Sequence, residues 1–458
     1  MKIDIPVHKG QQLEMKITSL GSSGEGVGKY ENFTVFVKGA LVGETVRTQI
    51  TLVKKTYAIG KLLEVLEAAK TRVQPKCPVY EQCGGCQLQH LSYEGQLDMK
   101  RQQVRDALAR IGHLPQVEVL PTMPCENPWN YRNKMQVPVA GAAGKAHIGC
   151  FAEATHRVID VENCLIQKQK NNEIVTVVRE WMKKYKIAPY DEDKRTGIVR
   201  HIMGRVGVHT GEVMVCLITA QDNVPHIKDL SKMLKSALPG VKSVVQNVNK
   251  RHTNVILGNK TQLVYGKETI KDKIGSLKFN ISAQSFFQVN SEQAERLYNK
   301  ALEFAALQGD EIVVDVYCGT GTITQFLAKK ARFAYGIEIV PSAIRDAKKN
   351  ALDNHVQNTG FILGDAAVEM PKLVEEGVRP DVIVIDPPRA GCEERVLAAM
   401  AKVKPKRIVY VSCNPATLAR DLAFMDKHGY KTKVVQPVDM FPHTAHVENV
   451  CLIIRIKP

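Results

Sequence analysis

Two short segments near the C-terminus carry side chains that suit covalent chemistry. The first is Ser412-Cys413-Asn414-Pro415, which directly follows an apolar, strand-like run and ends it sharply at the proline. A thiol in such a turn faces a cleft, and the amino end of a following helix would lower its pKa. The alternative is a core cysteine, because cysteines are often buried. We expect Cys413 to be an accessible nucleophile.

The second segment ends in a carboxylate. His446-Val447-Glu448 precedes a final apolar run, Val450–Ile456. If this last strand runs antiparallel to the others, Glu448 lies at their carboxyl edge beside Cys413, although 35 residues separate the two in sequence. A carboxylate in a partly apolar cleft suits a proton acceptor, and the alternative is a surface carboxylate at a strand start. His443 and His446 are expected to be structural or to orient a substrate.

A third group of residues suits a nucleoside-bearing cofactor. Asp315-Val316-Tyr317-Cys318-Gly319-Thr320-Gly321 joins an apolar strand to a helical stretch, and its glycines let a ligand approach the backbone. The turn has neither the G-x-G-x-x-G spacing nor the Lys-Ser/Thr of a P-loop. Glu338 ends the next strand, 23 residues after Asp315, where an acid suits ribose hydroxyls. Asp365 ends a third strand-like segment and suits an adenine amino group.

Two other interpretations of this turn are a tight connection without a ligand and a nicotinamide site. A methyl donor is preferred because the thiol and the carboxylate suit methyl transfer. Asp386-Pro387-Pro388-Arg389 ends a fourth strand. Amino-group methyltransferases end a related motif with an aromatic residue that stacks on the base, so Arg389 argues against methylation of an exocyclic amine.

A cysteine cluster lies far from these motifs in sequence. Cys77-x5-Cys83-x2-Cys86 is compact and rich in turn residues, and Cys164 is the best candidate for a fourth ligand. Four thiolates suit an iron–sulfur cluster or zinc. The other cysteines are expected to be core or backbone-adjacent residues: Cys125, Cys150, Cys216, Cys318, Cys392 and Cys451.

The elements that position these groups fall into three predicted parts. Residues 1–64 hold short strands with glycine turns, typical of a small OB-like barrel. Residues 65–280 carry the cysteine cluster and then strand-like runs with charged turns, which predicts a central α+β domain. Residues 281–458 alternate apolar strands with helical stretches, the pattern of a parallel α/β sheet whose ligands bind at the carboxyl ends of its strands.

Composition limits the function classes. The chain has 458 residues, a formal net charge of +16 and eleven cysteines. A basic balance favours a polyanionic partner, with a generally basic surface as the alternative. No apolar run is long enough for a membrane span, and the first residues lack a signal-peptide core. We therefore expect a cytoplasmic protein whose cysteines bind metal, catalyse or pack, rather than a disulfide framework.

The motifs resemble those of the RNA uracil-5-methyltransferase family over essentially the whole chain. They are Phe286-Phe287-Gln288-Val289-Asn290, the turn at residues 315–321, and the segments at residues 386–389, 412–415 and 446–448. The resemblance implies a Rossmann-like class I methyltransferase with Cys413 as nucleophile and Glu448 as base. It implies that S-adenosylmethionine binds at Gln288, Tyr317, Glu338 and Asp386. Asp365 and Thr322 are further cofactor candidates, and at Thr322 the family often has Asn.

The resemblance also implies that residues 1–64 form a TRAM domain, an OB-like RNA-binding barrel. A 4Fe–4S cluster would be held by Cys77, Cys83, Cys86 and Cys164. Because the transfer-RNA branch is expected to lack both barrel and cluster, the chain resembles the ribosomal branch, with 23S rRNA as partner and no protein partner. The segment at about residues 93–120 is expected to pack against the catalytic domain.

The implied reaction is methylation of carbon 5 of uridine through a covalent cysteine adduct. Four alternatives remain: the same chemistry on transfer RNA, cytosine-5 methylation of RNA, a non-catalytic RNA-binding protein, and a redox sensor built on the cluster with catalysis secondary. Cytosine-5 enzymes typically have a Pro-Cys turn after the strand that here ends at Asp386, whereas this chain has Pro387-Pro388 and no cysteine before Cys392. The presence of both Cys413 and Glu448 argues against the non-catalytic alternative.

Overall fold

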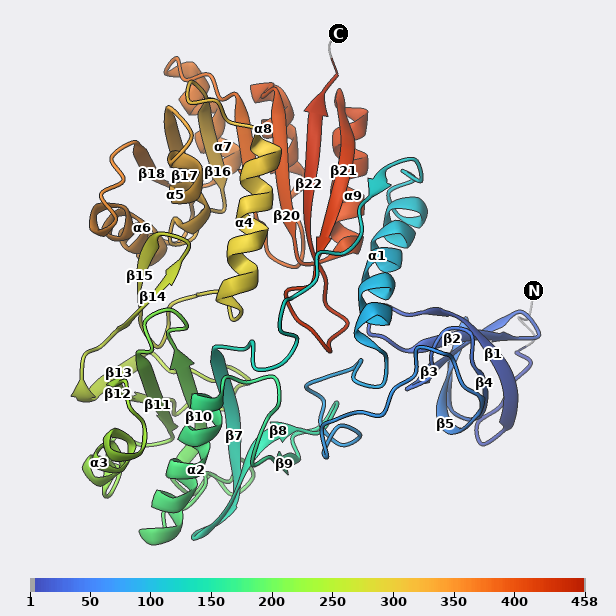
Figure 1. Ribbon diagram of the computed structural model, residues 1–458, viewed down its shortest axis with the longest axis vertical. Coiled ribbons are helices and arrows are strands. Elements are labelled where there is room, and N and C mark those ends of the chain that lie inside the picture. The colour runs from blue at the N-terminus through green and yellow to red at the C-terminus, as the bar shows by residue number, and fades with distance from the viewer. Residues whose placement is uncertain (1–4, 457–458) are drawn as a thin grey trace.

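The N-terminal strands close into a five-stranded barrel in the computed structural model, which describes residues 5–456 (Figure 1). The strand order is β1-β2-β3-β5-β4, and alternate residues of β1, such as Met15 and Ile17, are buried inside. This confirms the predicted N-terminal barrel. The strands are β1 (Gln12–Leu20), β2 (Gly26–Tyr30), β3 (Phe33–Lys38), β4 (Thr45–Val53) and β5 (Tyr57–Glu67).

The central part is a mixed seven-stranded sheet in the order β13-β12-β11-β10-β7-β8-β9. Two helices, α2 (Gln169–Lys184) and α3 (Ile227–Ala237), pack on it, and the fully buried Trp181 of α2 belongs to the core between them. A separate hairpin, β14 (Ile270–Ile274) and β15 (Leu277–Ile281), follows. The sheet strands are β7 (Lys134–Ala142), β8 (Lys145–Phe151), β9 (Val158–Asp160), β10 (Val199–Val206), β11 (Val213–Thr219), β12 (Val241–Val248) and β13 (Lys260–Gly266).

The C-terminal part is an eight-stranded sheet in the order β18-β17-β16-β19-β20-β22-β21-β6. The first five strands of this order are parallel, as the alternation of strands and helices predicts, whereas β22 runs antiparallel to both β20 and β21. The strands are β16 (Ile312–Val316), β17 (Phe333–Glu338), β18 (Thr359–Leu363), β19 (Val382–Ile385), β20 (Arg407–Ser412), β21 (Tyr430–Val438) and β22 (Glu448–Arg455).

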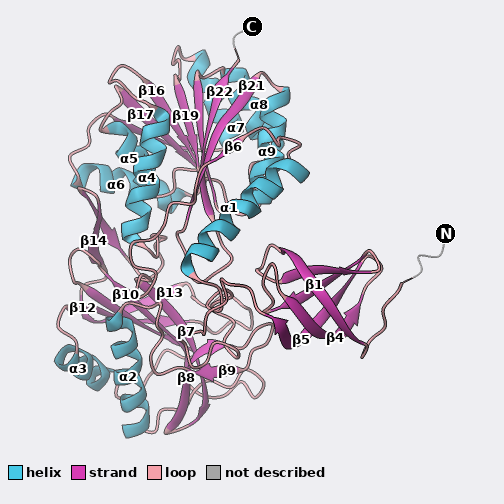
Figure 2. Cartoon of the chain, turned by 45° about the vertical axis from the view of Figure 1, so that its right-hand side comes forward, coloured by secondary structure: helices cyan, strands magenta, loops and turns pink. Residues whose placement is uncertain are grey.

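Helices cover both faces of this sheet (Figure 2). One core layer lies under α4 (Ser291–Ala305) and α5 (Thr322–Ala328), with α6 (Pro341–Asp353) beside them. The other lies under α7 (Ala366–Glu375), α8 (Glu394–Val403) and α9 (Pro415–Lys427). The central strands β19 and β20 are almost wholly apolar because both of their faces are covered.

An N-terminal segment completes the C-terminal sheet. Helix α1 (Tyr93–Arg110) lies against α9, and the short strand β6 (Glu118–Val119) pairs in parallel with β21 at the sheet edge. Figure 1 shows α1 between the barrel and the C-terminal sheet. Among the described residues, no helix combines the length and apolarity needed to cross a membrane.

Candidate active site and cysteine cavity

The sheet register brings the candidate nucleophile and base together. Ser412, the last residue of β20, is paired with Asn449 of the antiparallel β22. Cys413 follows Ser412 and Glu448 precedes Asn449, so both lie beside this last pair, and the Glu448 charge acts on the Cys413 thiol. The Asn449 amide supports this end of the pair by donating to the Ser412 carbonyl at 3.3 Å. A separation of 35 residues in sequence therefore becomes a neighbouring position in space.

Burial and charge shape the acidity of these groups. Burial raises the pKa of Glu448 to about 8, with the Asp386 carboxylate as a second cause, and burial raises that of Asp386 to about 7. The pKa of Cys413 is raised to about 11, first by burial and then by Glu448 and Asp386. Arg389 lowers the pKa of both Cys413 and Glu448. The expected depression of the Cys413 pKa by the helix terminus is therefore wrong, because desolvation and two nearby carboxylates outweigh that effect.

The loop that carries Asp386 and Arg389 is fastened to the helix that follows Cys413. The Asn414 side chain caps α9 and also donates to the Arg389 carbonyl at 3.1 Å. The buried Asp421 of α9 accepts from the Cys392 amide at 2.8 Å and from the Tyr410 hydroxyl at 2.6 Å. These contacts fix the loop after β19 relative to Cys413.

A glycine makes this close approach of loop and helix possible. Gly391 has a φ of +78°, which favours glycine, and a Cβ atom there would lie 2.6 Å from the Arg420 side chain and 2.7 Å from that of Asp421. Larger residues at this position would push the loop away from α9. The position of the loop that carries Arg389 thus depends on Gly391, which has no reactive side chain.

The cofactor candidates gather at the carboxyl edge of the same sheet. Tyr317 follows β16 in a left-handed conformation with a φ of +66°, and Gly321 caps α5 with a φ of +76°. Glu338, at the end of β17, accepts from the Gly319 amide at 3.1 Å and from the Val340 amide at 2.9 Å. Its carboxylate is therefore held in one orientation and keeps acceptor capacity for a ligand. No atom lies within 4 Å of the place where a Gly319 Cβ would be, so the turn faces open space.

Two other candidates already have structural partners. Asp365 caps α7 by accepting from the Ala367 amide at 2.9 Å and pairs with Arg395 at 2.6 Å. A ligand at Asp365 would compete with these contacts or use the remaining lone pairs. Thr322 is the first residue of α5, directly after the glycine turn.

Asp315 lies below the glycine turn and is fully buried. Its Oδ2 accepts from the Thr324 hydroxyl at 2.5 Å, whereas Oδ1 has no partner among the described groups. Burial raises its pKa to about 7. A carboxylate with one unsatisfied oxygen at this place fits a cationic or hydrogen-bonding ligand nearby.

Gln288 comes from a segment that crosses between the central and C-terminal parts. Its carbonyl accepts from the Asn133 side chain at 3.0 Å, and Asn290 caps α4 while donating to the Met440 carbonyl at 3.1 Å. The preceding Phe286 is 76% exposed, although it is a large aromatic side chain. The segment thus brings an amide and an uncovered ring next to the loop that leads to Glu448.

That loop, residues 439–447, descends from the C-terminal sheet toward the cysteine-rich segment (Figure 1). Its His443 has a φ of +66°, and the His443 carbonyl accepts from the Gln87 and Leu88 amides at 3.0 and 2.9 Å. The Gln96 side chain of α1 accepts from the His443 amide at 2.9 Å. The His443 ring stacks on Trp129 with centroids 3.8 Å apart. His443 is therefore a structural residue, and we call residues 439–447 the catalytic loop.

Five cysteines line one cavity of about 240 Å³, which we call the cysteine cavity. They include the four proposed ligands, and each of these influences the acidity of another through space. Among residues 5–456, however, no group of three or more His, Cys, Asp or Glu side chains has the arrangement of a site for a single metal ion. The cysteines are Cys77, Cys83, Cys86, Cys150 and Cys164.

Cys150 is the member of this cavity for which the sequence analysis expected a core or backbone-adjacent position. Cys150 lies near the end of β8. The segment around Cys83 is attached there by a β-bridge between Cys83 and Ala152 and by a 3.2 Å hydrogen bond from the Gly84 amide to the Phe151 carbonyl. Cys150 is therefore not a core residue, since it is only half-buried and lines the cavity. No spacing signal marks it, because it reaches the cavity through sheet pairing.

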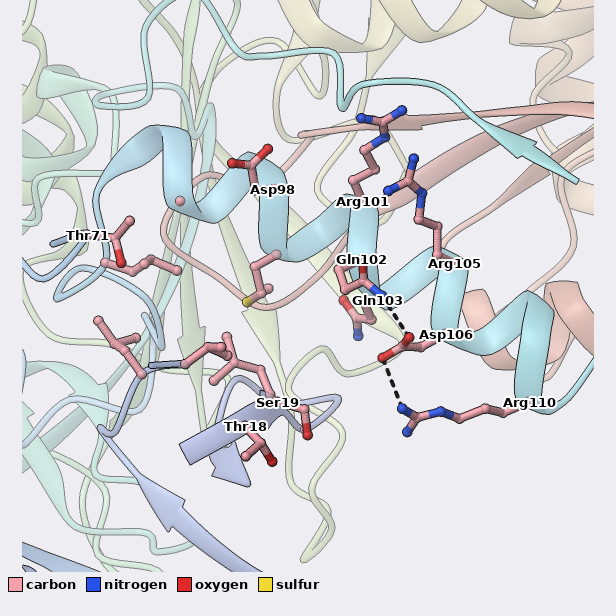
Figure 3. Close-up of a pocket in the computed structure, with 17 residues that line it drawn as sticks. Thr18, Ser19, Thr71, Asp98, Arg101, Gln102, Gln103, Arg105, Asp106 and Arg110 are labelled. Carbon is pink, nitrogen blue, oxygen red and sulfur yellow. Dashed lines mark hydrogen bonds and ion pairs between the residues drawn. The ribbon is translucent and has the colours of Figure 1, made fainter. Parts of the chain in front are cut away.

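Another hollow of about 610 Å³ separates the barrel from α1 (Figure 3). Arg101, Arg105 and Arg110 line its α1 side, and Thr18 and Ser19 of β1 lie opposite. Arg101 donates to the Val119 carbonyl at 2.9 and 2.8 Å, and Arg110 pairs with Asp106 at 3.7 Å. Arg105 is exposed. Figure 3 shows Arg110 on the barrel side of α1, whereas the Arg101 and Arg105 side chains point away from Thr18 and Ser19.

Comparison with known proteins gives matches over the full length. The family profile described as tRNA (Uracil-5-)-methyltransferase matches residues 92–456, and the TRAM domain profile matches residues 6–63. The chain is 50% identical over 453 residues to an RNA methyltransferase of Clostridium tetani, covering 99% of this chain and 98% of that protein. It is 50% identical over 452 residues to one of Halalkalibacterium halodurans, covering 99% of each.

A solved structure is also similar. It is the Pyrococcus abyssi tRNA (uracil-54, C5)-methyltransferase in complex with S-adenosyl-L-homocysteine, with a TM-score of 0.78 and 29% sequence identity. The match covers 96% of this chain and 99% of that chain, so it extends into the barrel. The expectation that a barrel separates ribosomal from transfer-RNA enzymes is therefore wrong, because an enzyme named for tRNA matches nearly the whole length.

Proposed function

Since the chain belongs to the tRNA (uracil-5-)-methyltransferase family, we propose that it methylates carbon 5 of a uridine in RNA through a covalent adduct with Cys413. The observation that carries this proposal is the last β20–β22 pair, Ser412 with Asn449, which is followed by Cys413 on one strand and preceded by Glu448 on the other. Arg389 and Asp386 complete the group. The reaction needs a thiol, a base and a cofactor site, and the candidates for all three lie at the same edge of the sheet.

Carbon 5 of uracil is a poor nucleophile until carbon 6 is attacked. The Cys413 thiolate adds to carbon 6, and the ring becomes an enolate with electron density at carbon 5. Bound S-adenosylmethionine supplies the electrophilic methyl group. Glu448 then removes the proton from carbon 5, and the returning electron pair expels the Cys413 thiolate. A uridine inside folded RNA must first leave its stack to reach this cleft.

The raised pKa values fit a site that becomes fully charged only when its ligands bind. In the free protein, Asp386, Glu448 and Cys413 each keep the proton to a higher pH than usual. Arg389 already lowers two of these pKa values, and a cationic sulfonium near Asp386 would act in the same direction. Thiolate formation would thus be coupled to binding of the methyl donor.

The cofactor proposal assigns roles along the carboxyl edge of the sheet. Glu338, oriented by two backbone amides, would bind the ribose hydroxyls, and the open turn at Gly319 would face the donor. Tyr317, Asp386 and Gln288 border this edge. Thr322 begins α5 at the same turn, and Asp365 would reach the adenine from the end of β18.

The cysteine cavity is proposed to hold a 4Fe–4S cluster on Cys77, Cys83, Cys86 and Cys164. Zinc is the alternative for four thiolates, with its ligands at about 2.0–2.3 Å from one ion. A cubane instead binds each thiolate to a different iron, so its ligands surround a volume such as this 240 Å³ cavity. The donor set, all thiols, suits iron–sulfur chemistry.

We propose large-subunit 23S rRNA as the substrate. The expectation came from the barrel and the cluster together, and the proposed cluster is the part of that resemblance that remains. The net charge of +16 and the arginine-lined hollow beside the barrel suit a large folded RNA. Transfer RNA is the second candidate, favoured by the full-length match to the archaeal tRNA enzyme.

Nucleoside mass spectrometry of RNA from a deletion strain tests both the proposed reaction and the proposed RNA substrate. Ribosomal and transfer RNA are separated first, and a strain that expresses Cys413→Ala serves as the matched control. Loss of 5-methyluridine from 23S rRNA in both strains is the expected result. Loss from transfer RNA alone would keep the chemistry and replace the substrate, and no loss in either fraction would refute the proposed activity.

A further inference from the structure

The cysteine cavity contains one thiol more than the proposed cluster would use. A 4Fe–4S cluster takes four cysteine ligands, and Cys150 is the fifth thiol of the cavity. Cys83 lines the same cavity, and for Cys83 and Cys150 alike the other thiol is the first cause of the change in pKa, which places the two side chains close together. Both residues are half-buried, so solvent-borne reagents can reach the cavity.

The backbone holds this thiol pair together. The bridge between Cys83 and Ala152 and the hydrogen bond from the Gly84 amide to the Phe151 carbonyl attach the cysteine-rich segment to the end of β8. A Cβ on Gly84 would lie 3.1 Å from the Glu153 Cα, which shows how closely the two chains approach. The Cys83–Cys150 contact is therefore a feature of the sheet edge and not of one flexible side chain.

We propose that Cys83 and Cys150 form an oxidation-sensitive thiol pair: in the cluster-free chain a peroxide joins them in a disulfide, which withdraws Cys83 from iron. The disulfide itself needs only the two thiols. Only its effect on iron binding rests on the proposed cluster. Cys150 thus has a role that a core cysteine would not have.

The reaction balances with hydrogen peroxide as the oxidant. One thiol of the pair attacks peroxide and becomes a sulfenic acid with release of one water. The second thiol then attacks that sulfur, forms the S–S bond and releases a second water. The two thiols together give up two electrons and two protons, and peroxide is reduced to two waters.

A thiol-mapping experiment on the full-length chain tests the pair. Protein stripped of metal by a chelator under argon is treated with hydrogen peroxide, its remaining thiols are alkylated, and its peptides are analysed by mass spectrometry. The expected result is a cross-linked peptide that contains Cys83 and Cys150. A dominant cross-link between Cys83 and Cys77, Cys86 or Cys164 would overturn the proposal.

Iron uptake gives an independent measurement. Peroxide-treated wild type is expected to rebuild no cluster from iron and sulfide until dithiothreitol is added, whereas Cys150→Ser rebuilds it directly. Cys451→Ala, which removes a buried thiol of β22, is the matched control and should behave as wild type. Failure of untreated Cys150→Ser to bind iron would make Cys150 a ligand and refute its role as the spare thiol. Neither measurement uses methyl transfer, so their outcome is separate from that of the proposed function.

Discussion

At the scale of single residues, the site combines three weakly acidic groups with one cation. Burial disfavours the charged forms of Cys413, Glu448 and Asp386. Repulsion adds to this effect at Glu448, from Asp386, and at Cys413, from both carboxylates. Arg389 opposes this effect, and its loop is fixed by Asn414 at the start of α9. Reactivity at Cys413 therefore depends on neighbours that come from three different strand ends.

Replacing the candidate nucleophile should separate chemistry from cofactor binding. Cys413→Ala is expected to lower methyl transfer by roughly a thousandfold or more, because no other group can activate carbon 6. Affinity for S-adenosylhomocysteine, measured by calorimetry, should be unchanged because the cofactor edge lies on other strands. Cys216→Ala, at a buried thiol of β11, is the control. Turnover retained in Cys413→Ala would refute the covalent mechanism.

Replacing the candidate base should trap the covalent species. In Glu448→Gln, Cys413 can still add and the methyl group can still move, but proton removal from carbon 5 fails. A protein–RNA adduct that survives a denaturing gel is expected, with labelled methyl in the adduct. The double variant Cys413→Ala/Glu448→Gln should give none. If no adduct forms in the single variant, the base lies elsewhere.

The same variant has a predictable effect on stability. The folded pKa of Glu448 is raised to about 8, above an unfolded value of about 4.3. Folding therefore favours the protonated carboxyl, and this contribution is lost as pH rises from the unfolded toward the folded pKa. Glutamine mimics the protonated form. The melting temperature of Glu448→Gln relative to wild type should rise from pH 5 to about pH 8 and then level; a constant difference would contradict the buried placement.

At the scale of elements, α1 fastens the catalytic loop to the rest of the molecule. Lys100 of α1 and Asp439 form an ion pair of 2.5 Å in which both side chains are fully buried, and Lys100 also donates to the Phe441 carbonyl at 3.1 Å. Gln96 donates to the Leu88 carbonyl at 3.1 Å and accepts from the His443 amide. One helix face thus connects the cysteine-rich segment to the loop that leads to Glu448.

Breaking the buried pair on one side should be costly. Lys100→Met leaves Asp439 charged and unpaired in the interior, which is expected to cost about 3–5 kcal/mol of unfolding free energy. Urea unfolding followed by tryptophan fluorescence measures it. Lys100→Met/Asp439→Leu removes both charges and should recover most of the loss. Equal stability of the single and double variants would show that packing, rather than the unpaired charge, dominates.

At the scale of the whole molecule, the three parts meet around the catalytic loop. The barrel and α1 border the arginine-lined hollow, the central sheet supplies β8 to the cysteine cavity, and the C-terminal sheet carries Cys413 and Glu448. Gln87 and Leu88, directly after Cys86, hold the His443 carbonyl. The cysteine cavity is therefore linked to catalytic geometry through the backbone and does not need to touch the substrate.

Removal of the proposed cluster tests this link. Anaerobically purified protein should be brown, with about four iron atoms per chain. Chelation is expected to lower kcat because the catalytic loop loses its support at Gln87 and Leu88, while S-adenosylhomocysteine affinity stays the same. Wild type kept under argon without chelator is the control. A colourless protein that contains zinc would refute the cluster, and an unchanged kcat after iron loss would refute the link.

The sequence by itself determined the parts whose signals are local. The barrel follows from alternating strands and glycine turns, and the parallel sheet follows from the alternation of apolar strands and helices, because side-chain periodicity depends on near neighbours. The motifs around Asp386 and Cys413 lie in turns at strand ends, where reactive groups of such sheets are found. Family membership was accessible for the same reason, since short motifs carry it.

Only the tertiary structure decided how distant segments combine. The antiparallel β22 brings Glu448 to the end of β20 that Cys413 follows, and sheet pairing at β8 brings Cys150 to a cavity that its spacing does not reveal. The raised pKa of Cys413 likewise depends on burial and on carboxylates from other strands, which outweigh the local effect of a helix terminus. Strand pairing and burial depend on segments that are distant in sequence, so no local pattern predicts them.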